Sequence, residues 1–288
     1  MRLGFIGLGT MGAPMALNLC RKFPVTVWNR SPSKYLALTK AGAAVGENPS
    51  KLIEKSDIIF TMLFDESAIR SILNDDVRRA LRGKTLVNTS SVSVSFSHSL
   101  AALVYQAGGD FIEMPVSGSR DPAEKGQLIG MVAGDPAVAE RIKPFVEPMT
   151  SAAIYCGPIG RALKTKYAVN LFLITMTAGI AESANLARAQ GLNLEAFRQV
   201  LNSGPLASAY SKLKLAKILE DDWSAQAAIK DCYNSTQLIR AAADEANVSV
   251  PLIQLCGSLY KRAYESGLGE EDMIAIGKLF SDPMPSEQ

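Results

Sequence analysis

The sequence is poor in the residues that build metal centres and disulfide frameworks. It contains one histidine, His98, and four widely scattered cysteines, and no Cys-x-x-Cys pair occurs. Structural zinc needs closely spaced Cys and His ligands, so we expect no metal site. Scattered cysteines are also typical of a reducing compartment, and we therefore expect a cytoplasmic protein without structural disulfides.

A dominant charge and a long apolar run are also lacking. The formal net charge is +2 at pH 7, which gives no electrostatic basis for binding nucleic acid or an anionic membrane. No stretch reaches the ~18 uninterrupted apolar residues of a membrane span. The short apolar run at the N-terminus ends in glycines and does not resemble a signal peptide. We expect neither nucleic acid nor a membrane as partner, and 288 residues, 48% of them hydrophobic, suffice for two domains.

What the sequence has is a glycine motif directly after its first apolar run. Residues 2–6 predict a buried strand, Gly7-x-Gly9-x-x-Gly12 follows, and a helix is expected from residue 13 to about residue 20. In dinucleotide-binding folds the first glycine permits a tight turn and the second lets the backbone approach a pyrophosphate. The third lets the helix pack on the strand. The helix N-terminus then offers free N–H groups to the phosphates.

Strand and helix patterns alternate through the first half of the chain. Apolar runs predict strands at 2–6, 24–28, 58–63, 85–88, 111–114 and 128–133, and helical patterns fill gaps at 31–41, 50–55, 66–81 and 95–107. This alternation predicts an α/β domain at 1–160, with a Rossmann-type, doubly wound parallel sheet. Ligands of such sheets bind beyond the carboxyl ends of the strands.

The strand pattern stops near residue 158. Residues 161–190 predict one helix, ~45 Å long at ~1.5 Å per residue. It is apolar nearly all round from Leu171 to Ile180, so we expect it to be buried at the heart of the second domain. Gly179 costs ~1 kcal/mol inside a helix, and we expect a closely packed neighbour there. Further helices at 194–202, 206–218, 223–246, 250–266 and 269–279 make 161–288 an all-α domain, with a loose tail at 283–288.

The residues after the second predicted strand bear on the choice of cofactor. NAD-binding folds usually have an acid here that holds the ribose 2′-hydroxyl, whereas this chain has Asn29, Arg30 and Ser31, with Lys34 close behind. An acid would repel a 2′-phosphate, and an arginine with a hydroxyl would bind one. The pattern favours NADP(H) over NAD(H), which remains the alternative, and a solvated arginine in a turn is the competing interpretation.

Three polar segments are candidates for the chemistry. Two of them, 88–91 and 115–119, directly follow predicted strands, and the third, 157–170, opens the long helix. Lys166 and Asn170 in the third are four residues apart and share one helix face. A lysine buried in an apolar helix loses its proton readily, so Lys166 is a candidate general acid and base. The competing interpretation is a solvated lysine in the first turns of a helix.

Taken together, these motifs resemble the β-hydroxyacid dehydrogenase family, which includes 3-hydroxyisobutyrate dehydrogenases and the tartronate semialdehyde and glyoxylate/succinic semialdehyde reductases. The resemblance covers nearly the whole chain. It is carried by the glycine motif, Pro115-Val-Ser-Gly118, the Lys166/Asn170 pair and Ile229-Lys230-Asp231. The turn at 29–31 and the stretch from Pro115 to Gly126 are most similar to the NADPH-preferring glyoxylate/succinic semialdehyde branch.

The resemblance implies a role for each matching residue. Lys166 would donate the proton during aldehyde reduction, Asn170 would hold the substrate and orient the lysine, and Ser117, Gly118 and Ser119 would bind the substrate carboxylate. The cofactor would be bound by Gly7, Gly9, Thr10, Met11, Gly12, Asn29, Arg30, Ser31, Leu63, Ser91, Lys230 and Asp231. The site would form in a cleft between the domains, and a homodimer or homotetramer through the helical domain is expected.

The chain also departs from the family pattern. It has Ala162 where a glycine is common, Ser119-Arg120 where a second small residue is common, and one asparagine, Asn170, where many members have two polar groups. These departures put the identity of the substrate in doubt. Arg120 would bind a second acidic group of the substrate or face solvent. An imine reductase and a catalytically silent scaffold of the same fold are the alternatives, and the presence of Lys166 argues against both.

Overall fold

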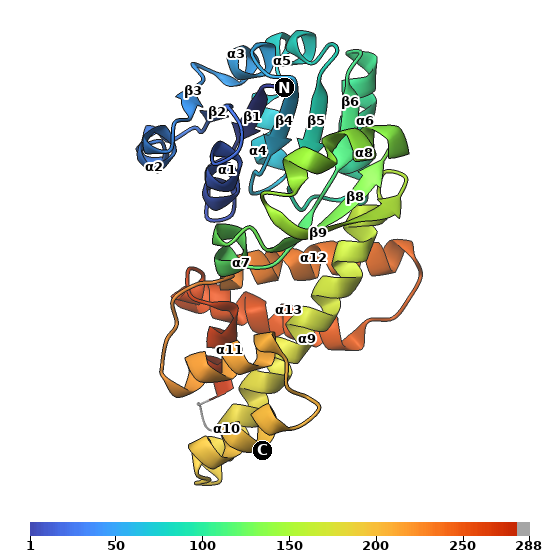
Figure 1. The fold of residues 1–288 in the computed structure, drawn as a ribbon. Coiled ribbons are helices and arrows are strands. Elements are labelled where there is room, and N and C mark those ends of the chain that lie inside the picture. The colour runs from blue at the N-terminus through green and yellow to red at the C-terminus, as the bar shows by residue number, and fades with distance from the viewer. Residues whose placement is uncertain (281–288) are drawn as a thin grey trace. The chain divides into compact units, whose positions relative to one another are not determined.

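The computed structural model, drawn in Figure 1, describes residues 1–280. The tail expected at 283–288 lies outside the described residues. The chain divides into two compact units, Met1–Lys166 and Tyr167–Gln288. Helix α9 (Arg161–Ala189) begins where the sequence predicts the second domain to begin, and the division between the units falls after its first turns.

The first unit is built on a nine-stranded sheet, which confirms the Rossmann-type α/β prediction. The strand order is β3-β2-β1-β4-β5-β6-β8-β7, with β9 paired to β8, and every pair from β3 to β6 is parallel. The strands are β1 (Leu3–Ile6), β2 (Val25–Trp28), β3 (Ala44–Val45), β4 (Ile58–Thr61), β5 (Thr85–Asn88), β6 (Asp110–Glu113), β7 (Val116–Ser117), β8 (Leu128–Gly134) and β9 (Thr150–Gly157).

One edge of this sheet departs from the fully parallel prediction. Strand β8 runs antiparallel to β6 and to β7. A parallel return needs a crossover of a dozen or more residues, usually a helix. Only β7 and the short helix α7 (Arg120–Glu124) lie between β6 and β8, so the chain folds straight back. Strand β9, which the sequence analysis missed, then pairs parallel with β8.

The remaining helices of the first unit follow the predicted alternation. They are α1 (Gly12–Cys20), a 3-10 turn at Pro32–Lys34, α2 (Leu36–Lys40), α3 (Pro49–Glu54), α4 (Glu66–Ile72), α5 (Asp75–Ala80), α6 (Val94–Gln106) and α8 (Pro136–Val146). The single helix predicted at 66–81 is wrong. Leu73 leaves helical geometry, and the Asn74 side chain accepts a hydrogen bond from the Val77 N–H at 2.9 Å and so starts a second helix.

The second unit is all-helical over its described residues, as predicted. After α9 it contains α10 (Leu194–Ser203), α11 (Ala209–Leu219), α12 (Ile229–Glu245), α13 (Pro251–Ala263), a π turn at Tyr264–Leu268 and a 3-10 helix at Met273–Phe280. Its core includes Ile229, Ile253, Tyr260 and Ile274, all fully buried. The predicted helix at 223–246 begins only at Ile229, and residues 223–228 are not helical.

The expected burial of the middle of α9 is wrong. Between Leu171 and Ile180 only Ile174, Thr177 and Ala178 are buried, and Phe172 is 66% exposed. A Cβ at Gly179 would meet no atom within 4 Å, so no neighbouring helix packs closely there in the single chain. By length and composition α9 also reaches the limits for a membrane span, a test that core helices of soluble proteins pass as well. The apolar surface of α9 is therefore only partly buried within one chain.

A buried ion pair holds two segments of the second unit together. Lys214 Nζ on α11 lies 2.6 Å from Asp272 Oδ1, and both side chains are almost fully buried. The same carboxylate accepts hydrogen bonds from the N–H groups of Gln226 at 2.8 Å and Ile274 at 3.0 Å. Asp272 thus joins α11, the approach to α12 and the start of the final 3-10 helix.

Candidate active site

The residues of the first unit that are predicted to bind cofactor and substrate follow adjacent parallel strands. They therefore lie together at the carboxyl ends of these strands. Backbone and side-chain hydrogen bonds tie the successive loops together at these ends. The Leu8 N–H donates to Asn29 Oδ1 at 2.9 Å, and the Leu63 N–H donates to Ser90 Oγ at 2.8 Å. The Met114 N–H donates to the Asn88 carbonyl at 2.8 Å. The Met62 N–H donates to the Ile6 carbonyl at 2.9 Å, so the ends of β1, β2, β4, β5 and β6 form one connected rim.

The glycine loop has the geometry that its spacing predicts. Gly7 has φ +99°, and a Cβ there would lie 2.2 Å from the Met62 carbonyl oxygen. A Cβ at Gly12 would lie 2.0 Å from the Gly7 carbonyl oxygen, so α1 can begin this close to β1 only without a side chain. A Cβ at Gly9 would meet nothing within 4 Å, and Gly9 and Thr10 are exposed. The loop therefore offers open backbone at the N-terminus of α1, which fits a pyrophosphate.

Asn29 plays a structural part that the sequence analysis did not foresee. Its Oδ1 accepts from the Leu8 N–H, and its Nδ2 donates to the Ser31 carbonyl at 3.1 Å. The Tyr35 hydroxyl forms hydrogen bonds with the backbone of the same residue. It donates to the Asn29 carbonyl at 2.7 Å and accepts from the Asn29 N–H at 2.9 Å. Asn29 thus ties the glycine loop to the turn after β2, and Tyr35 holds Asn29.

We expect Tyr35→Phe to weaken dinucleotide binding several-fold. The variant loses two hydrogen bonds that fix the Asn29 backbone, worth ~1 kcal/mol each, and the glycine loop is held through that residue. Fluorescence titration with NADPH and NADH measures the change. Tyr105→Phe, at an exposed tyrosine on α6, is the matched control. Unchanged affinity in Tyr35→Phe would contradict this role for Tyr35.

The turn after β2 exposes positive charge. Arg30, Ser31 and Lys34 are all exposed, and among the described residues neither Arg30 nor Lys34 forms an ion pair. A guanidinium, an ammonium and a hydroxyl on one turn match the donors that a phosphate prefers. Since this turn is joined to the glycine loop through Asn29, it fits the place of a phosphorylated adenosine ribose.

The residues predicted to bind substrate lie on the turn after β6. Ser117 belongs to β7, and Gly118 has φ +129° with a Cβ position only 2.7 Å from Leu128 Cδ2. The backbone conformation thus favours glycine at 118, and a Cβ there would also require the Leu128 side chain to shift. Ser119 follows, and Arg120 pairs with Glu124 at 2.8 Å on the exposed side of α7. The structure places Arg120 in a surface ion pair. Ser91, which is half-buried, follows β5 on the same rim.

Lys166 reaches this turn from α9. Its Nζ donates to the Val116 carbonyl at 2.6 Å, directly before Ser117 and Gly118. The side chain is half-buried, whereas Lys164, two residues earlier, is exposed. Asn170 lies four residues further on in α9, the spacing that puts two side chains on one helix face. The structure therefore brings Lys166 to the predicted carboxylate-binding turn.

The other two predicted residues belong to the second unit. Lys230 Nζ forms a surface ion pair with the Glu270 carboxylate at 2.5 Å. Asp231 follows in the first turn of α12, where its Oδ2 accepts from the Ala228 N–H at 3.4 Å. Burial raises the pKa of the Asp231 carboxyl. Within residues 1–280, no group of three or more His, Cys, Asp or Glu side chains is arranged to hold a metal ion.

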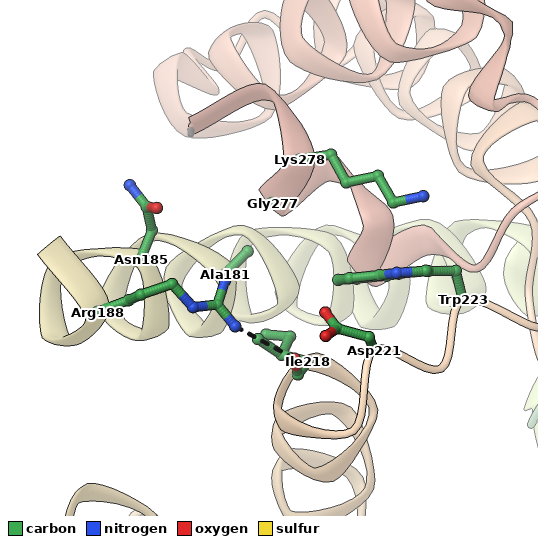
Figure 2. Close-up of a pocket in the computed structure, with 8 residues that line it drawn as sticks. All are labelled: Ala181, Asn185, Arg188, Ile218, Asp221, Trp223, Gly277 and Lys278. Atoms are coloured by element: carbon green, nitrogen blue, oxygen red, sulfur yellow. Dashed lines mark hydrogen bonds between the residues drawn. The ribbon is translucent and has the colours of Figure 1, made fainter. Parts of the chain in front are cut away.

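A small pocket of about 240 Å³ lies elsewhere in the second unit (Figure 2). Asn185 and Arg188 of α9 line one side, and Trp223 and Lys278 line another, with the Lys278 ammonium 4.8 Å from the Trp223 ring centre. None of the residues predicted from the sequence lines it. Its volume is below the ~300–1,000 Å³ typical of small-molecule sites, so we assign it no ligand.

Comparisons with known proteins find related sequences along both units of the chain. Residues 2–157 match the family model for the NAD binding domain of 6-phosphogluconate dehydrogenase. Residues 160–280 match the model for the NAD-binding domain of NADP-dependent 3-hydroxyisobutyrate dehydrogenase. Glyoxylate/succinic semialdehyde reductase 1 of Arabidopsis thaliana is 33% identical over 280 residues, which cover 96% of this chain and 97% of that protein.

Two solved structures have the same fold. A 3-hydroxyisobutyrate dehydrogenase from Salmonella typhimurium superposes with a TM-score of 0.89 at 21% identity, covering 97% of this chain and 100% of that one. Psf3, solved in complex with NADP+ and 2-OPP, superposes with a TM-score of 0.90 at 27% identity over the same shares of the two chains.

Proposed function

We propose that this chain, which belongs to the β-hydroxyacid dehydrogenase family, uses NADPH to reduce a short-chain aldehyde acid such as glyoxylate or succinic semialdehyde. The family makes it an NAD(P)-dependent β-hydroxyacid dehydrogenase or semialdehyde reductase, and the same site would run the reverse oxidation. The observation that carries the proposal is the contact of Lys166 Nζ with the Val116 carbonyl, which sets an ammonium beside the turn at Ser117 and Gly118.

The mechanism follows from what these groups can do. When bound, the cofactor supplies a hydride to the carbonyl carbon of the substrate. Negative charge then develops on the carbonyl oxygen, where the Lys166 ammonium stabilises it and gives up a proton, so that one hydride and one proton complete the alcohol. The Ser117 hydroxyl and the Gly118 N–H bind the substrate carboxylate, and Asn170 orients the substrate and the lysine. Lys230 and Asp231 would help to bind the cofactor.

Assembly and location form part of the same proposal. Apolar side chains that stay exposed on α9, such as Phe172, support a homodimer or homotetramer formed through the helical unit. The near-neutral net charge and the wide spacing of the four cysteines support a cytoplasmic protein that binds a small carboxylate rather than nucleic acid or membrane.

The direct test is the oxidation of NADPH and NADH with glyoxylate, succinic semialdehyde, tartronate semialdehyde and methylmalonate semialdehyde. Turnover that prefers NADPH with one of these aldehydes supports the proposal and identifies the substrate. NADPH binding without turnover of any aldehyde would contradict it. A parallel assay with an amine and a ketone detects the alternative, imine reduction, and a protein silent in both assays would be a scaffold.

We expect Arg30→Ala to raise the KM for NADPH ~5–10-fold and to leave the KM for NADH unchanged. The reason is that Arg30 would contact only the 2′-phosphate, and an exposed charge-assisted hydrogen bond is worth ~1–1.5 kcal/mol. Steady-state kinetics with both cofactors measures the difference. Lys40→Ala, at an exposed lysine ending α2, is the control. Equal changes in both KM values would mean that Arg30 acts on the loop and not on the phosphate.

A further inference from the structure

We propose that Glu113, at the end of β6, is the positioning residue that sets the catalytic lysine in place. The inference rests on the proposed function, since it gives the part of the fold that aims Lys166 at its substrate. Glu113 is fully buried, and it stands on the strand that leads directly into the substrate-binding turn.

The Glu113 carboxylate is bonded to the beginning of α9. Its Oε2 accepts from the Gly160 N–H at 3.0 Å, and its Oε1 accepts from the Leu163 N–H at 2.9 Å. The first N–H groups of a helix have no partner within the helix, and Gly160 has no side chain with which to cap them. The Glu113 carboxylate, which comes from another element, therefore caps the N-terminus of α9. The positive end of the helix dipole favours its negative charge.

The third donor to the carboxylate is a neutral hydroxyl. The Ser97 hydroxyl of α6 donates to Oε2 at 2.5 Å. Among the described residues, no lysine, arginine or histidine forms an ion pair with Glu113. A buried charge is costly unless hydrogen bonds satisfy it, and here two of the three donors belong to one helix terminus. The position of the α9 terminus is thereby fixed relative to β6.

Lys166 continues this row of contacts. The strand and the following turn meet α9 twice, through Glu113 with Gly160 and Leu163 and through the Val116 carbonyl with Lys166. Positions 163 and 166 are three residues apart and lie on one face of the helix. A shift of the helix start would therefore move the Lys166 amine away from Val116 and from the substrate carboxylate site beside it. Misplacement of a catalytic group by ~1 Å can cost ~10²-fold in rate.

Glu113→Gln tests this role, because the amide keeps the size but turns one acceptor into a donor that faces a helix N–H. We expect kcat for aldehyde reduction to fall ~10–100-fold with the KM for NADPH unchanged. Glu113→Asp, which keeps the charge on a shorter side chain, should lose less. Ser97→Ala removes the third donor without touching α9, so it should lower the melting temperature with little effect on kcat. Rates are expressed per NADPH-binding site, so that misfolded protein does not count.

A double variant separates positioning from general damage. In the Lys166→Ala background, Glu113→Gln should cause no further loss of residual activity, because its effect passes through the lysine. An equal loss in both backgrounds would overturn the proposal, and so would wild-type kcat in a folded Glu113→Gln protein.

A readout without substrate keeps the inference separate from the proposed function. Acetic anhydride labelling followed by mass spectrometry reports the reactivity of each lysine amine. We expect Glu113→Gln to change the labelling rate of Lys166 several-fold and to leave that of exposed Lys164 unchanged. If the wild type reduces no aldehyde but this change occurs, the function is wrong and the positioning holds. If aldehydes are reduced and Lys166 labels equally in both proteins, the positioning is wrong.

Discussion

Lys166→Ala is expected to lower kcat for aldehyde reduction by ~10²–10⁴-fold, the usual contribution of a positioned general acid. The affinity for NADPH should stay unchanged, because the glycine loop is held by Asn29 and Tyr35 and not by the lysine. Stopped-flow measurement of a single turnover gives the chemical step directly, and fluorescence titration gives the affinity.

The neighbouring lysine provides the control for that experiment. Lys164 is exposed and two residues away on α9, so Lys164→Ala keeps the net-charge change without removing the amine beside Val116. It should turn over like the wild type. Activity that survives in Lys166→Ala would assign the proton donor elsewhere, and lost NADPH binding would give the lysine a structural part.

Asp272→Asn is expected to destabilise the helical unit by ~3–5 kcal/mol, the typical cost of removing one partner of a buried ion pair. The Lys214 ammonium would remain buried without its counter-charge, and one of the bonds to Gln226 and Ile274 would also be lost. Urea unfolding measures the loss. Glu195→Gln breaks the exposed pair with Arg198, which solvent screens, and should leave the stability nearly unchanged.

Two further measurements identify the unpaired charge as the cause. Adding Lys214→Met to Asp272→Asn removes that charge and should restore part of the stability. Burial already lowers the pKa of Lys214 below its ordinary value of 10.5. The unfolded chain then binds more protons than the folded one between the two pKa values, so the single variant should gain stability as the pH rises toward 10.5. A loss that neither change relieves would point to the hydrogen bonds instead.

The sequence predicts well those parts of the fold that have a local signal. Strands β1, β2, β4 and β5 are short runs rich in apolar and β-branched residues, and the glycine spacing describes a loop in which Gly7 and Gly12 leave no room for a Cβ. Strand β9 lacks that signal. Residues 151–155 are exposed and include two alanines, and only pairing with β8 makes them a strand. The local signal for the break between α4 and α5 is Asn74, a good helix N-cap.

The candidate site divides in the same way. Residues within a motif, such as Ser117 and Lys166, are found from their spacing. Glu113 and Tyr35 act through partners 47 and 6 residues away, and neither belongs to a motif. The available clue to Glu113 was a carboxylate inside an otherwise apolar strand, which must find donors if it is buried. The burial of Lys214 is not predictable in this way, because the several lysines of α11 indicate a solvated helix face.

The division of labour after β2 has a consequence for redesigning the enzyme. The Asn29 carboxamide forms hydrogen bonds to the backbone of the protein itself, whereas Arg30 and Ser31 have exposed side chains that can donate to a ligand. Exchanging Asn29 for an aspartate would keep the acceptor for the Leu8 N–H but would lose the donor to the Ser31 carbonyl, so it would loosen the turn that carries Arg30 and Ser31. Mutagenesis libraries that aim to switch cofactor should randomise 30, 31 and 34 and keep 29 fixed. Natural drift in cofactor choice can follow the same route, because those surface positions change without cost to the scaffold.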